Sequence, residues 1–351
     1  MEKFDIYKEI HDQPKTWELI KEDFEENKEK IRDFLSSSDS FFFTGCGSGY
    51  NASVYSRNAG EFFLEKCCFD YQASEIKFFG SNIYKKGIIK NPVTFLFSRS
   101  GNTTETVDAL KYLNSSRFSK SFGITCNEDS YLYKNSDFTF SLSKASEKAI
   151  VTTKSFTSMA LLPLLIFSDL SKEYDCFEDL KKLPDLGQRI IDKYENMSRE
   201  LGENEAIDKF FILSNTPNFG LAREFKLKIL EMTLSWADCF NTMDFRHGPR
   251  ATVDKNSLII FFLSDKAIDY ELNLARELKE IGANLLVFAG IVPKEFYNLT
   301  NNIVETGEKI SEWLRGILFL PVIHFLSYYR ALKKGLNPDK PKNLTYFVEI
   351  K

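Results

Sequence analysis

Short apolar runs alternate with longer amphipathic stretches through the first half of this chain. The runs are rich in Phe, Val, Ile and Leu, which is typical of strands that are buried on both faces of a parallel sheet. The stretches between them carry helix formers at helical spacing. The predicted strands are 41–44, 75–79, 93–97, 120–125 and 138–142. The pattern predicts an α/β domain built on a doubly wound parallel sheet.

The alternation resumes after a polar helical stretch, in which residues 185–200 are predicted to form a connecting helix. The strands predicted beyond it are 210–214, 257–263 and 284–288, with helices at 221–236 and 270–281. The predicted division is a helical segment 1–28, a first domain 29–171, a helical linker 172–202, a second domain 203–335 and an extended tail 336–351.

Composition agrees with a globular protein of two domains. The chain has 351 residues, of which 43% are apolar and 27% charged, so there is ample material for packed cores. The net charge is −4, and Lys and Arg are scattered among the acidic residues. Nucleic acid is therefore not an expected partner.

The chain carries no evident signal or membrane segment. The first 29 residues lack the apolar core of a secretory signal, and the apolar stretch 317–325 is too short to cross a bilayer. Six cysteines show no C-x-x-C pairing, so we expect reduced thiols and a cytoplasmic location. With three histidines and no ligand spacing, we expect no metal and no other cofactor.

A loop rich in hydroxyl groups follows the strand predicted at 93–97. Ser98, Ser100 and Thr103 lie just before a helical pattern that begins at residue 107, and Gly101 permits close backbone approach. A helix N-terminus with free N–H groups favours anions, so this loop suits a phosphate. The alternative is that the hydroxyl groups only cap the helix.

A glycine-rich loop, GCGSG, follows the strand predicted at 41–44. Gly45, Gly47 and Gly49 allow a ligand near the backbone, and Ser48 adds a donor. Two such loops at one edge of a parallel sheet form a ligand crevice. A dinucleotide is the competing ligand, but the spacing is G-x-G-x-G, and no acidic residue ends the next predicted strand.

Both loops, GCGSGYNAS and FSRSGNTTET, resemble the sugar-phosphate loops in the isomerase half of glucosamine-6-phosphate synthase. The resemblance continues in order through EKAIVTTKSFTSMALL, EFKLKILEMTLSWADCFNTMDFRHGPRATVD and GLNPDKPKNLTYFVEI, and covers about residues 29–350. It implies two tandem SIS (sugar isomerase) domains, each with a five-stranded parallel sheet of the flavodoxin-like type between helices. It also implies that the C-terminal tail covers an active site.

The same resemblance implies a set of substrate-binding residues: Cys46, Gly47, Ser48, Ser98, Arg99, Ser100, Thr103, Thr152 and Tyr346. Arg99 departs from the synthase-like loops, which carry Gln at this place, and a cation there would strengthen phosphate binding. Lys154 allows a Schiff base in principle, but we expect it to orient its loop or to pair with an acidic residue.

Glu231 and His247 are the candidate catalytic residues. Aldose–ketose interconversion needs an acid–base group for ring opening and a carboxylate that moves a proton between C1 and C2. Glu231 borders a predicted apolar stripe of Leu227, Leu230 and Leu234, which would raise its proton affinity; the alternative is a surface acid paired with Lys226 or Lys228. The resemblance implies that the His247 loop reaches the pocket of a neighbouring subunit, in a homodimer.

Tyr346 is a second departure, because the synthase carries at this place the Lys that captures the ketose. No glutaminase half is evident either, since residue 2 is Glu. We therefore predict a phosphosugar isomerase/deaminase that acts on an amino sugar or sugar-amine 6-phosphate, similar to glucosamine-6-phosphate deaminase or fructosamine-6-phosphate deglycase. The alternatives are an aldose–ketose isomerase without amine release, a non-catalytic sugar-phosphate sensor and a structural interaction protein.

Overall fold

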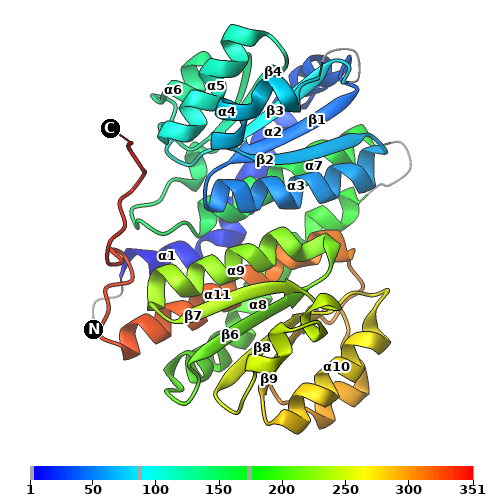
Figure 1. Ribbon diagram of the computed structural model, residues 1–351, viewed down its shortest axis with the longest axis vertical. Helices are drawn as coiled ribbons and strands as arrows, with labels where there is room; N and C mark the ends of the chain where they lie inside the picture. Colours follow the sequence, from blue (N-terminus) through cyan, green and yellow to red (C-terminus); the bar gives the residue numbers. More distant parts are fainter. Residues whose placement is uncertain (1–3, 86–88, 172–175, 351) are drawn as a thin grey trace. The chain divides into compact units, whose positions relative to one another are not determined.

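The computed structural model describes residues 4–85, 89–171 and 176–350, and the chain divides into two compact units (Figure 1). The first unit comprises Asp12–Lys181 and Thr345–Lys351. The second unit comprises Met1–His11 and Lys182–Leu344. Each unit thus takes most of its residues from one half of the chain and a short segment from a chain end.

The first unit is a five-stranded parallel sheet between helices, with strand order β2-β1-β3-β4-β5. Its strands are β1 Ser40–Gly45, β2 Cys67–Gln72, β3 Pro92–Phe97, β4 Lys120–Thr125 and β5 Phe138–Ser141. Its helices are α2 Gln13–Leu35, α3 Ser48–Leu64, α4 Ala73–Ile83, α5 Thr104–Ser116, α6 Tyr131–Asn135 and α7 Lys154–Leu170. Helices α2, α3 and α7 pack together, and α4, α5 and α6 pack together on the opposite face (Figure 1).

The second unit repeats this architecture, with strand order β10-β9-β8-β6-β7. Its strands are β6 Lys209–Ser214, β7 Trp236–Asn241, β8 Ser257–Phe262, β9 Asn284–Ala289 and β10 Ile303–Glu305. Its helices are α1 Asp5–His11, α9 Phe219–Thr233, α10 Ile268–Ile281, α11 Glu312–Lys333 and most of α8 Phe177–Glu203. Short 3₁₀ turns are η1 Ser143–Ala145 in the first unit and η2 Thr216–Asn218, η3 Asp244–Arg246, η4 Pro249–Thr252 and η5 Lys294–Asn298 in the second.

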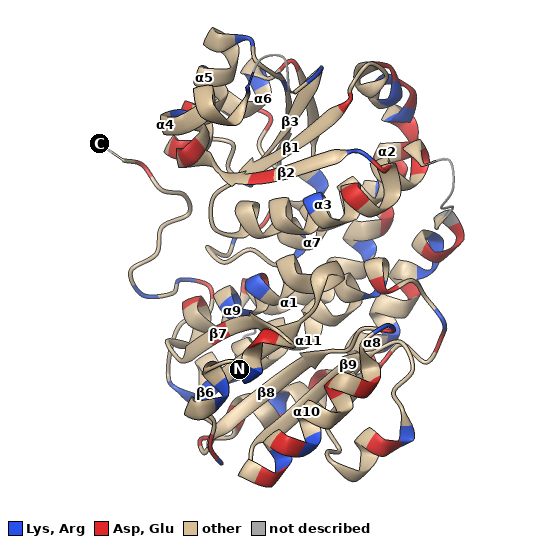
Figure 2. Cartoon of the chain, turned by 45° about the vertical axis from the view of Figure 1, so that its right-hand side comes forward, with Lys and Arg blue, Asp and Glu red and all other residues tan. Residues whose placement is uncertain are grey.

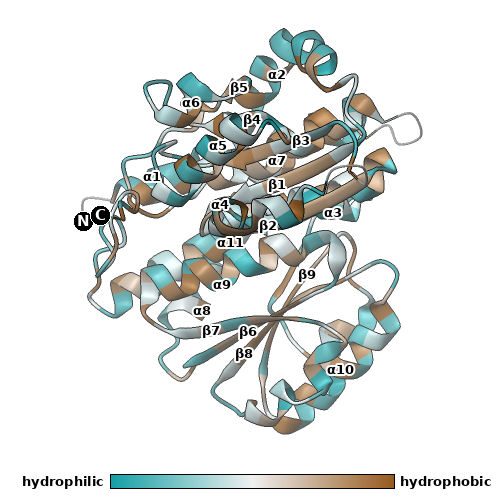
Figure 3. Ribbon diagram, turned by 45° about the horizontal axis from the view of Figure 1, so that its top comes forward, coloured by the Kyte–Doolittle hydropathy of each residue, from teal (hydrophilic) through white to brown (hydrophobic). Residues whose placement is uncertain are grey.

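Aromatic side chains fill the core of the first sheet. Phe95 is fully buried, and its ring centroid lies 5.2 Å from that of Phe43 and 4.7 Å from that of Phe122. Figure 3 shows the central strands of both sheets in hydrophobic colours. Figure 2 shows acidic and basic residues interspersed on the helices around them.

Most predicted strands are present, but three differences stand out. The prediction of a strand at 75–79 is wrong, because these residues lie in α4 and the strand is β2 at Cys67–Gln72. Strand β2 is at the sheet edge and mostly half-exposed, so it lacks an apolar run. Strand β7 was not predicted either, because it is also a half-exposed edge strand without an apolar run. Strand β10 was not predicted because it is only three residues long.

Helix ends also differ from the predicted ones. The helix predicted at 221–236 ends at Thr233, because Leu234 turns the chain with φ 51°. Helix α5 begins at Thr104 instead of residue 107, and α2 continues past residue 28 to Leu35. Part of the predicted linker, residues 172–175, lies outside the described residues. Across the described ranges, no helix combines the length and the apolar character needed to cross a membrane.

Replacement of a core ring tests the packing of the first sheet. We expect Phe95→Ala to lower the free energy of unfolding by about 3–5 kcal/mol, because it leaves a cavity among stacked rings. The control Phe79→Ala removes a ring that is 57% exposed, and we expect less than about 0.5 kcal/mol. Urea unfolding measures both, and an equal loss in the two variants would contradict this packing.

Candidate functional site

The glycine-rich loop between β1 and α3 lies against the end of β3. Gly47 has φ 54°, a conformation that favours glycine. A Cβ on Gly49 would lie 2.5 Å from the carbonyl oxygen of Phe97, so only glycine allows this close approach. Ser48 follows as the first residue of α3. The loops after β1 and β3 therefore meet at the carboxyl edge of the sheet.

Three hydroxyl groups converge in the loop between β3 and α5. The Ser98 Oγ lies 3.5 Å from the Ser100 Oγ and 3.3 Å from the Thr103 Oγ1, and the last two are 3.4 Å apart. We call these three residues the hydroxyl triangle. Backbone N–H groups of Gly101 and Asn102 donate to the Ser98 and Ser100 oxygens, at 3.0 and 3.2 Å. Because α5 begins one residue after Thr103, the triangle lies at the positive end of its helix dipole.

Thr152 and Ser48 lie together at the same edge. The Thr152 hydroxyl donates to the Ser48 Oγ at 3.0 Å. The loop that carries Thr152 is fixed by Glu147, whose carboxylate accepts from the Thr153 N–H and hydroxyl at 2.6 Å each and from the Ser155 hydroxyl. The Glu147 side chain is fully buried and holds the residues around the start of α7. Sequence reasoning missed it; a lone acidic residue five positions before the TTKS motif at the start of α7 is the signal that marks it.

The guanidinium of Arg99 contacts the tail and the loop before α7. It donates to the carbonyl oxygens of Ala149 at 3.1 Å, Ile150 at 2.7 Å and Tyr346 at 3.0 Å, and stacks on the Tyr346 ring at 4.0 Å. One nitrogen lies 3.7 Å from the Glu147 carboxylate. The structure thus brings Arg99 and Tyr346 together, and it directs the Arg99 donors to carbonyl groups instead of toward the hydroxyl triangle.

Cys46 and Lys154, the remaining candidate residues of the first unit, make only local contacts. The Cys46 Sγ lies 3.7 Å from the Thr106 hydroxyl, and burial raises the pKa of the Cys46 thiol to about 11. A neutral thiol is a poor nucleophile, so Cys46 is suited only to lining the loop. Lys154 pairs with Asp12 at 3.7 Å, as the simpler interpretation predicts.

In the second unit, Glu231 belongs to a chain of charges along α9. The Lys228 Nζ lies 3.1 Å from a Glu224 oxygen and 2.7 Å from a Glu231 oxygen. Glu224 and Lys228 are buried, whereas the Glu231 side chain is 21% exposed. Burial alone would lower the pKa of Lys228, but the two carboxylates outweigh it and raise this pKa. We call Glu224, Lys228 and Glu231 the α9 charge triad.

The prediction that Leu227, Leu230 and Leu234 form a buried apolar stripe beside Glu231 is wrong. Leu230 is 37% exposed and Leu234 50% exposed, so they form an outer surface. The buried face is instead formed by Leu221, Phe225, Ile229 and Met232. The alternative partner Lys228 does pair with Glu231, but Lys228 lies on the buried face of the helix. Because a Lys is usually exposed, the sequence did not indicate that this face is buried.

His324 of α11 is a further buried group beside the triad. It is fully buried, and burial together with the charge of Lys228 lowers the pKa of His324 well below its usual value, so it is neutral. Helices α11 and α9 pack closely. The sequence did not single out His324, because its apolar neighbours in α11 are those of an ordinary core residue.

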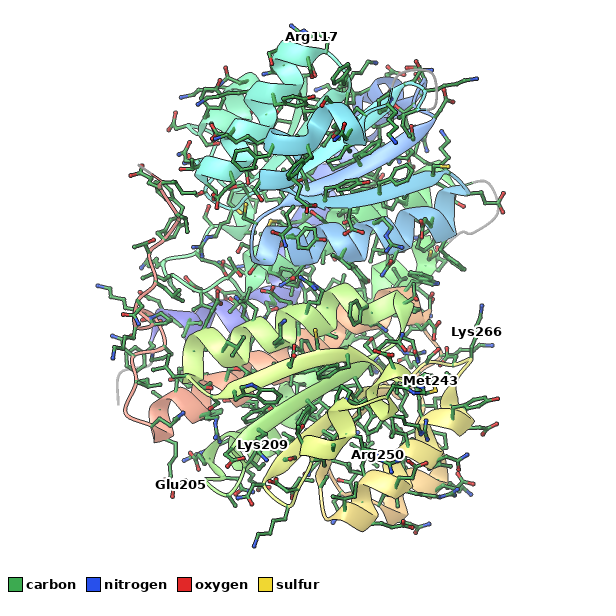
Figure 4. All side chains as sticks on the ribbon, in the orientation of Figure 1. Arg117, Glu205, Lys209, Met243, Arg250 and Lys266 are labelled. Carbon is green, nitrogen blue, oxygen red and sulfur yellow. The ribbon has the colours of Figure 1, made fainter. Side chains whose placement is uncertain are left out.

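His247 lies in a turn between η3 and η4 and is exposed. The turn depends on Gly248, with φ 128°. Arg246 and Arg250 both pair with Glu277 of α10, the first at 3.1 Å, and so fix the loop on the second unit. Met243 and Arg250, near the ends of this segment, are labelled in Figure 4. The loop is therefore anchored while the imidazole of His247 is presented outward.

The second sheet closes its own carboxyl edge with carboxylates. Glu271 is fully buried and accepts from the Asn215 side chain and the Ser264 N–H, each at 2.8 Å. Glu312 accepts from the Asp265 N–H at 2.8 Å. Burial raises the pKa of Glu271 to about 8. These N–H groups follow β8, the counterpart of β3, so internal acids occupy in this sheet the place where the first sheet carries the hydroxyl triangle.

Comparison with known proteins finds a family match within the first unit. Residues 34–167 match the SIS domain model, and they include the glycine-rich loop and the hydroxyl triangle.

Among individual proteins, the chain is 25% identical, over 98% of its length, to glutamine–fructose-6-phosphate aminotransferase (isomerizing) of Caldanaerobacter subterraneus, and covers 59% of that protein. The chain spans less than two thirds of the curated relatives it matches.

Two solved structures are similar over nearly the whole chain. Glucosamine-6-phosphate deaminase from Thermotoga maritima is 28% identical with a TM-score of 0.79, covering 98% of this chain and 99% of that one. Tagatose-6-phosphate ketose/aldose isomerase from Escherichia coli is 22% identical with a TM-score of 0.84, covering 96% and 94%. The second likeness concerns the fold alone.

The buried Glu271 predicts a pH dependence of stability. Because its pKa is raised from 4.5 to about 8 on folding, the folded state holds the proton more tightly than the unfolded chain. Its stabilising contribution is complete below pH 4.5 and is lost as the pH rises to about 8. Relative to Glu271→Gln, we expect the free energy of unfolding to fall by up to roughly 1.4 kcal/mol per pH unit in this window.

Urea unfolding of both proteins at successive pH values measures this difference. Glu280→Gln, which changes an exposed acid of the same helix, is the matched control and keeps the wild-type dependence. Parallel curves for the wild type and Glu271→Gln would contradict the prediction.

Proposed function

We propose that this chain is a phosphosugar isomerase/deaminase that acts on an amino sugar or sugar-amine 6-phosphate. The observation that carries the proposal is the hydroxyl triangle at the N-terminus of α5. Three hydroxyl groups within 3.5 Å of one another, at the positive end of a helix, match the oxygens and the charge of a phosphate. The glycine-rich loop beside it leaves room for the sugar.

We further propose that both units are SIS domains in tandem. The family model matches the first unit alone, and the support for the second is its topology. Read from β7, the order β7-β6-β8-β9-β10 is the same as β2-β1-β3-β4-β5. Both sheets thus share the flavodoxin-like order, in which ligands bind between the first and third strands.

In this proposal, Ser98, Ser100 and Thr103 hold the phosphate. The sugar lies along the β1 loop and the start of α7, where the Thr152 hydroxyl already contacts Ser48. The residues assigned to the sugar are Cys46, Gly47, Ser48, Thr152 and the tail residue Tyr346.

Glu231 is the proposed proton carrier. It takes a proton from C2 of the open-chain amino sugar and returns it to C1, while a proton passes from the amine nitrogen to O1, so that an enolamine becomes a C2 imine. Water then adds at C2, and ammonia leaves. Lys228 holds the Glu231 carboxylate in place at 2.7 Å.

His247 is the proposed acid–base group for ring opening. Its imidazole is exposed on an anchored loop, which suits a residue that acts outside its own unit. We propose a homodimer in which this loop reaches the site of the partner subunit.

Two observations favour amine release over plain isomerisation. Tyr346 replaces the Lys by which the synthase captures a ketose, and the deaminase of T. maritima is similar over the whole chain. Plain isomerisation remains the second candidate, because the same proton transfer suffices for it and the fold is shared with a ketose/aldose isomerase. A sensor would have no need of a buried Lys228 beside Glu231.

Incubation with glucosamine, galactosamine and fructosamine 6-phosphates tests the function. We expect release of ammonia or of a free amine together with a sugar phosphate, and a fall in turnover of about 10²–10⁴-fold in Glu231→Gln, because the proton carrier is lost. Glu205→Gln, which alters an acid that is 78% exposed and labelled in Figure 4, is the matched control.

Other outcomes of this assay are equally informative. Interconversion without amine release would favour the isomerase, and binding of every candidate without turnover would favour a sensor. Full turnover by Glu231→Gln would refute the assignment of that residue.

Ser100→Ala tests the phosphate site. Loss of one hydroxyl donor to a charged phosphate is expected to weaken binding of inorganic phosphate or substrate roughly tenfold to a hundredfold, measured by calorimetry. Ser115→Ala, at the far end of α5, is the control and is expected to bind normally. Unchanged affinity in Ser100→Ala would place the phosphate elsewhere.

A further inference from the structure

Two departures from the synthase pattern, Arg99 and Tyr346, are partners in this structure. They are 247 positions apart in the chain, yet the Arg99 guanidinium lies 4.0 Å from the centroid of the Tyr346 ring. It also donates to the Tyr346 carbonyl oxygen at 3.0 Å. The guanidinium stacks on the aromatic face and donates a hydrogen bond to the backbone of the same residue. It therefore fixes both the ring and the backbone of Tyr346.

Arg99 is itself held on a rigid platform. Its side chain is only 7% exposed, and the carbonyl oxygens of Ala149 and Ile150 take further donors. The Glu147 carboxylate, which is fully buried and bonded to Thr153 and Ser155, lies 3.7 Å from the guanidinium. Arg99 therefore joins the tail to the loop that also carries Thr152.

The tail has a second attachment, at the first residue of α5. The Thr104 N–H donates to the Val348 carbonyl oxygen at 3.2 Å, and the Ile350 N–H donates to the Thr104 hydroxyl at 3.0 Å. Thr104 directly follows Thr103 of the hydroxyl triangle. Residues 346–350 thus cross the start of α5, beside the proposed phosphate site.

A phosphate-binding role for Arg99 fits these contacts poorly. Three carbonyl groups and a carboxylate already surround its donors, and in a buried side chain each of these contacts would have to break before the guanidinium could turn to another anion. The hydroxyl triangle is supported without Arg99, because the backbone N–H groups of Gly101 and Asn102 donate to the Ser98 and Ser100 oxygens.

We propose that Arg99 is a positioning residue that, together with Tyr346, locks the tail across the start of α5. The tail then forms a fixed wall of the sugar-phosphate site, in place of the reactive arm that a Lys would supply. This inference rests on the proposed function for the identity of the site, but the lock itself is a property of the free protein. The lock depends on the contact between Arg99 and Tyr346, so loss of either side chain releases the tail.

Trypsin cleavage after the exposed Lys342, followed by mass spectrometry of the released C-terminal peptide, measures the lock in the intact protein without substrate. We expect Arg99→Gln and Tyr346→Ala each to speed this cleavage about five- to thirtyfold. The double variant should be no faster than Arg99→Gln alone, because Arg99→Gln already removes both the ring stack and the hydrogen bond to the carbonyl oxygen of residue 346. Tyr346→Phe loses the 3.4 Å hydrogen bond from the Tyr346 hydroxyl to the Glu147 carbonyl oxygen but keeps the ring stack, so its cleavage rate should stay close to that of the wild type.

Two controls separate the lock from general destabilisation. Arg32→Gln removes another arginine of the first unit, which pairs with Asp169, and should leave tail cleavage unchanged. Tyr346 is 41% exposed, so Tyr346→Ala is expected to fold even if Arg99→Gln does not. Cleavage at the wild-type rate in Tyr346→Ala, or additive effects in the double variant, would overturn the proposal.

Calorimetry with inorganic phosphate distinguishes the lock from a direct phosphate contact. We expect Arg99→Gln to change the phosphate Kd by no more than about threefold, in contrast to Ser100→Ala. A loss as large as that of Ser100→Ala, with tail cleavage unchanged, would make Arg99 a phosphate ligand and refute the inference. If the wild type binds no phosphate at all, the proposed function fails, and tail cleavage alone decides the inference.

Discussion

The site depends on a constraint of parallel sheets: every strand ends at the same edge, and neighbouring crossovers that leave toward opposite faces open a crevice there. In the first unit this happens between β1 and β3, because α3 and α5 lie on opposite faces of the sheet (Figure 1). The close approach of Gly49 to the carbonyl of Phe97 brings the two loops together at that point. The hydroxyl triangle and the Ser48–Thr152 contact are both placed by this geometry.

The same constraint acts in the second unit, but there carboxyl groups of the protein itself occupy the edge of the sheet. There the crevice is between β6 and β8, and the acids Glu271 and Glu312 bind its N–H groups. An internal carboxyl group at such a position satisfies buried donors that would otherwise need another acceptor. The first sheet therefore carries hydroxyl groups at this edge, where the second sheet carries internal acids.

The α9 charge triad illustrates how a buried charge is kept functional. An isolated Lys228 in the core would be costly, but Glu224 and Glu231 on either side offset its desolvation. Glu224 is buried with it, whereas Glu231 is partly exposed. The inner pair therefore serves as a fixed support, and the outer carboxylate keeps access to solvent.

The sequence by itself determined the class of fold, most strands and the two loops, because apolar runs and glycine or hydroxyl residues at strand ends are local signals. It could not place β2 and β7, whose edge positions remove the apolar pattern, nor the inner face of α9, where charged residues are buried. Tertiary structure decided the burial of Lys228 with Glu224, the contact of the Thr152 hydroxyl with Ser48, and the contact of Arg99 with Tyr346. The last of these joins residues 247 positions apart, and no local pattern in the sequence encodes such a contact.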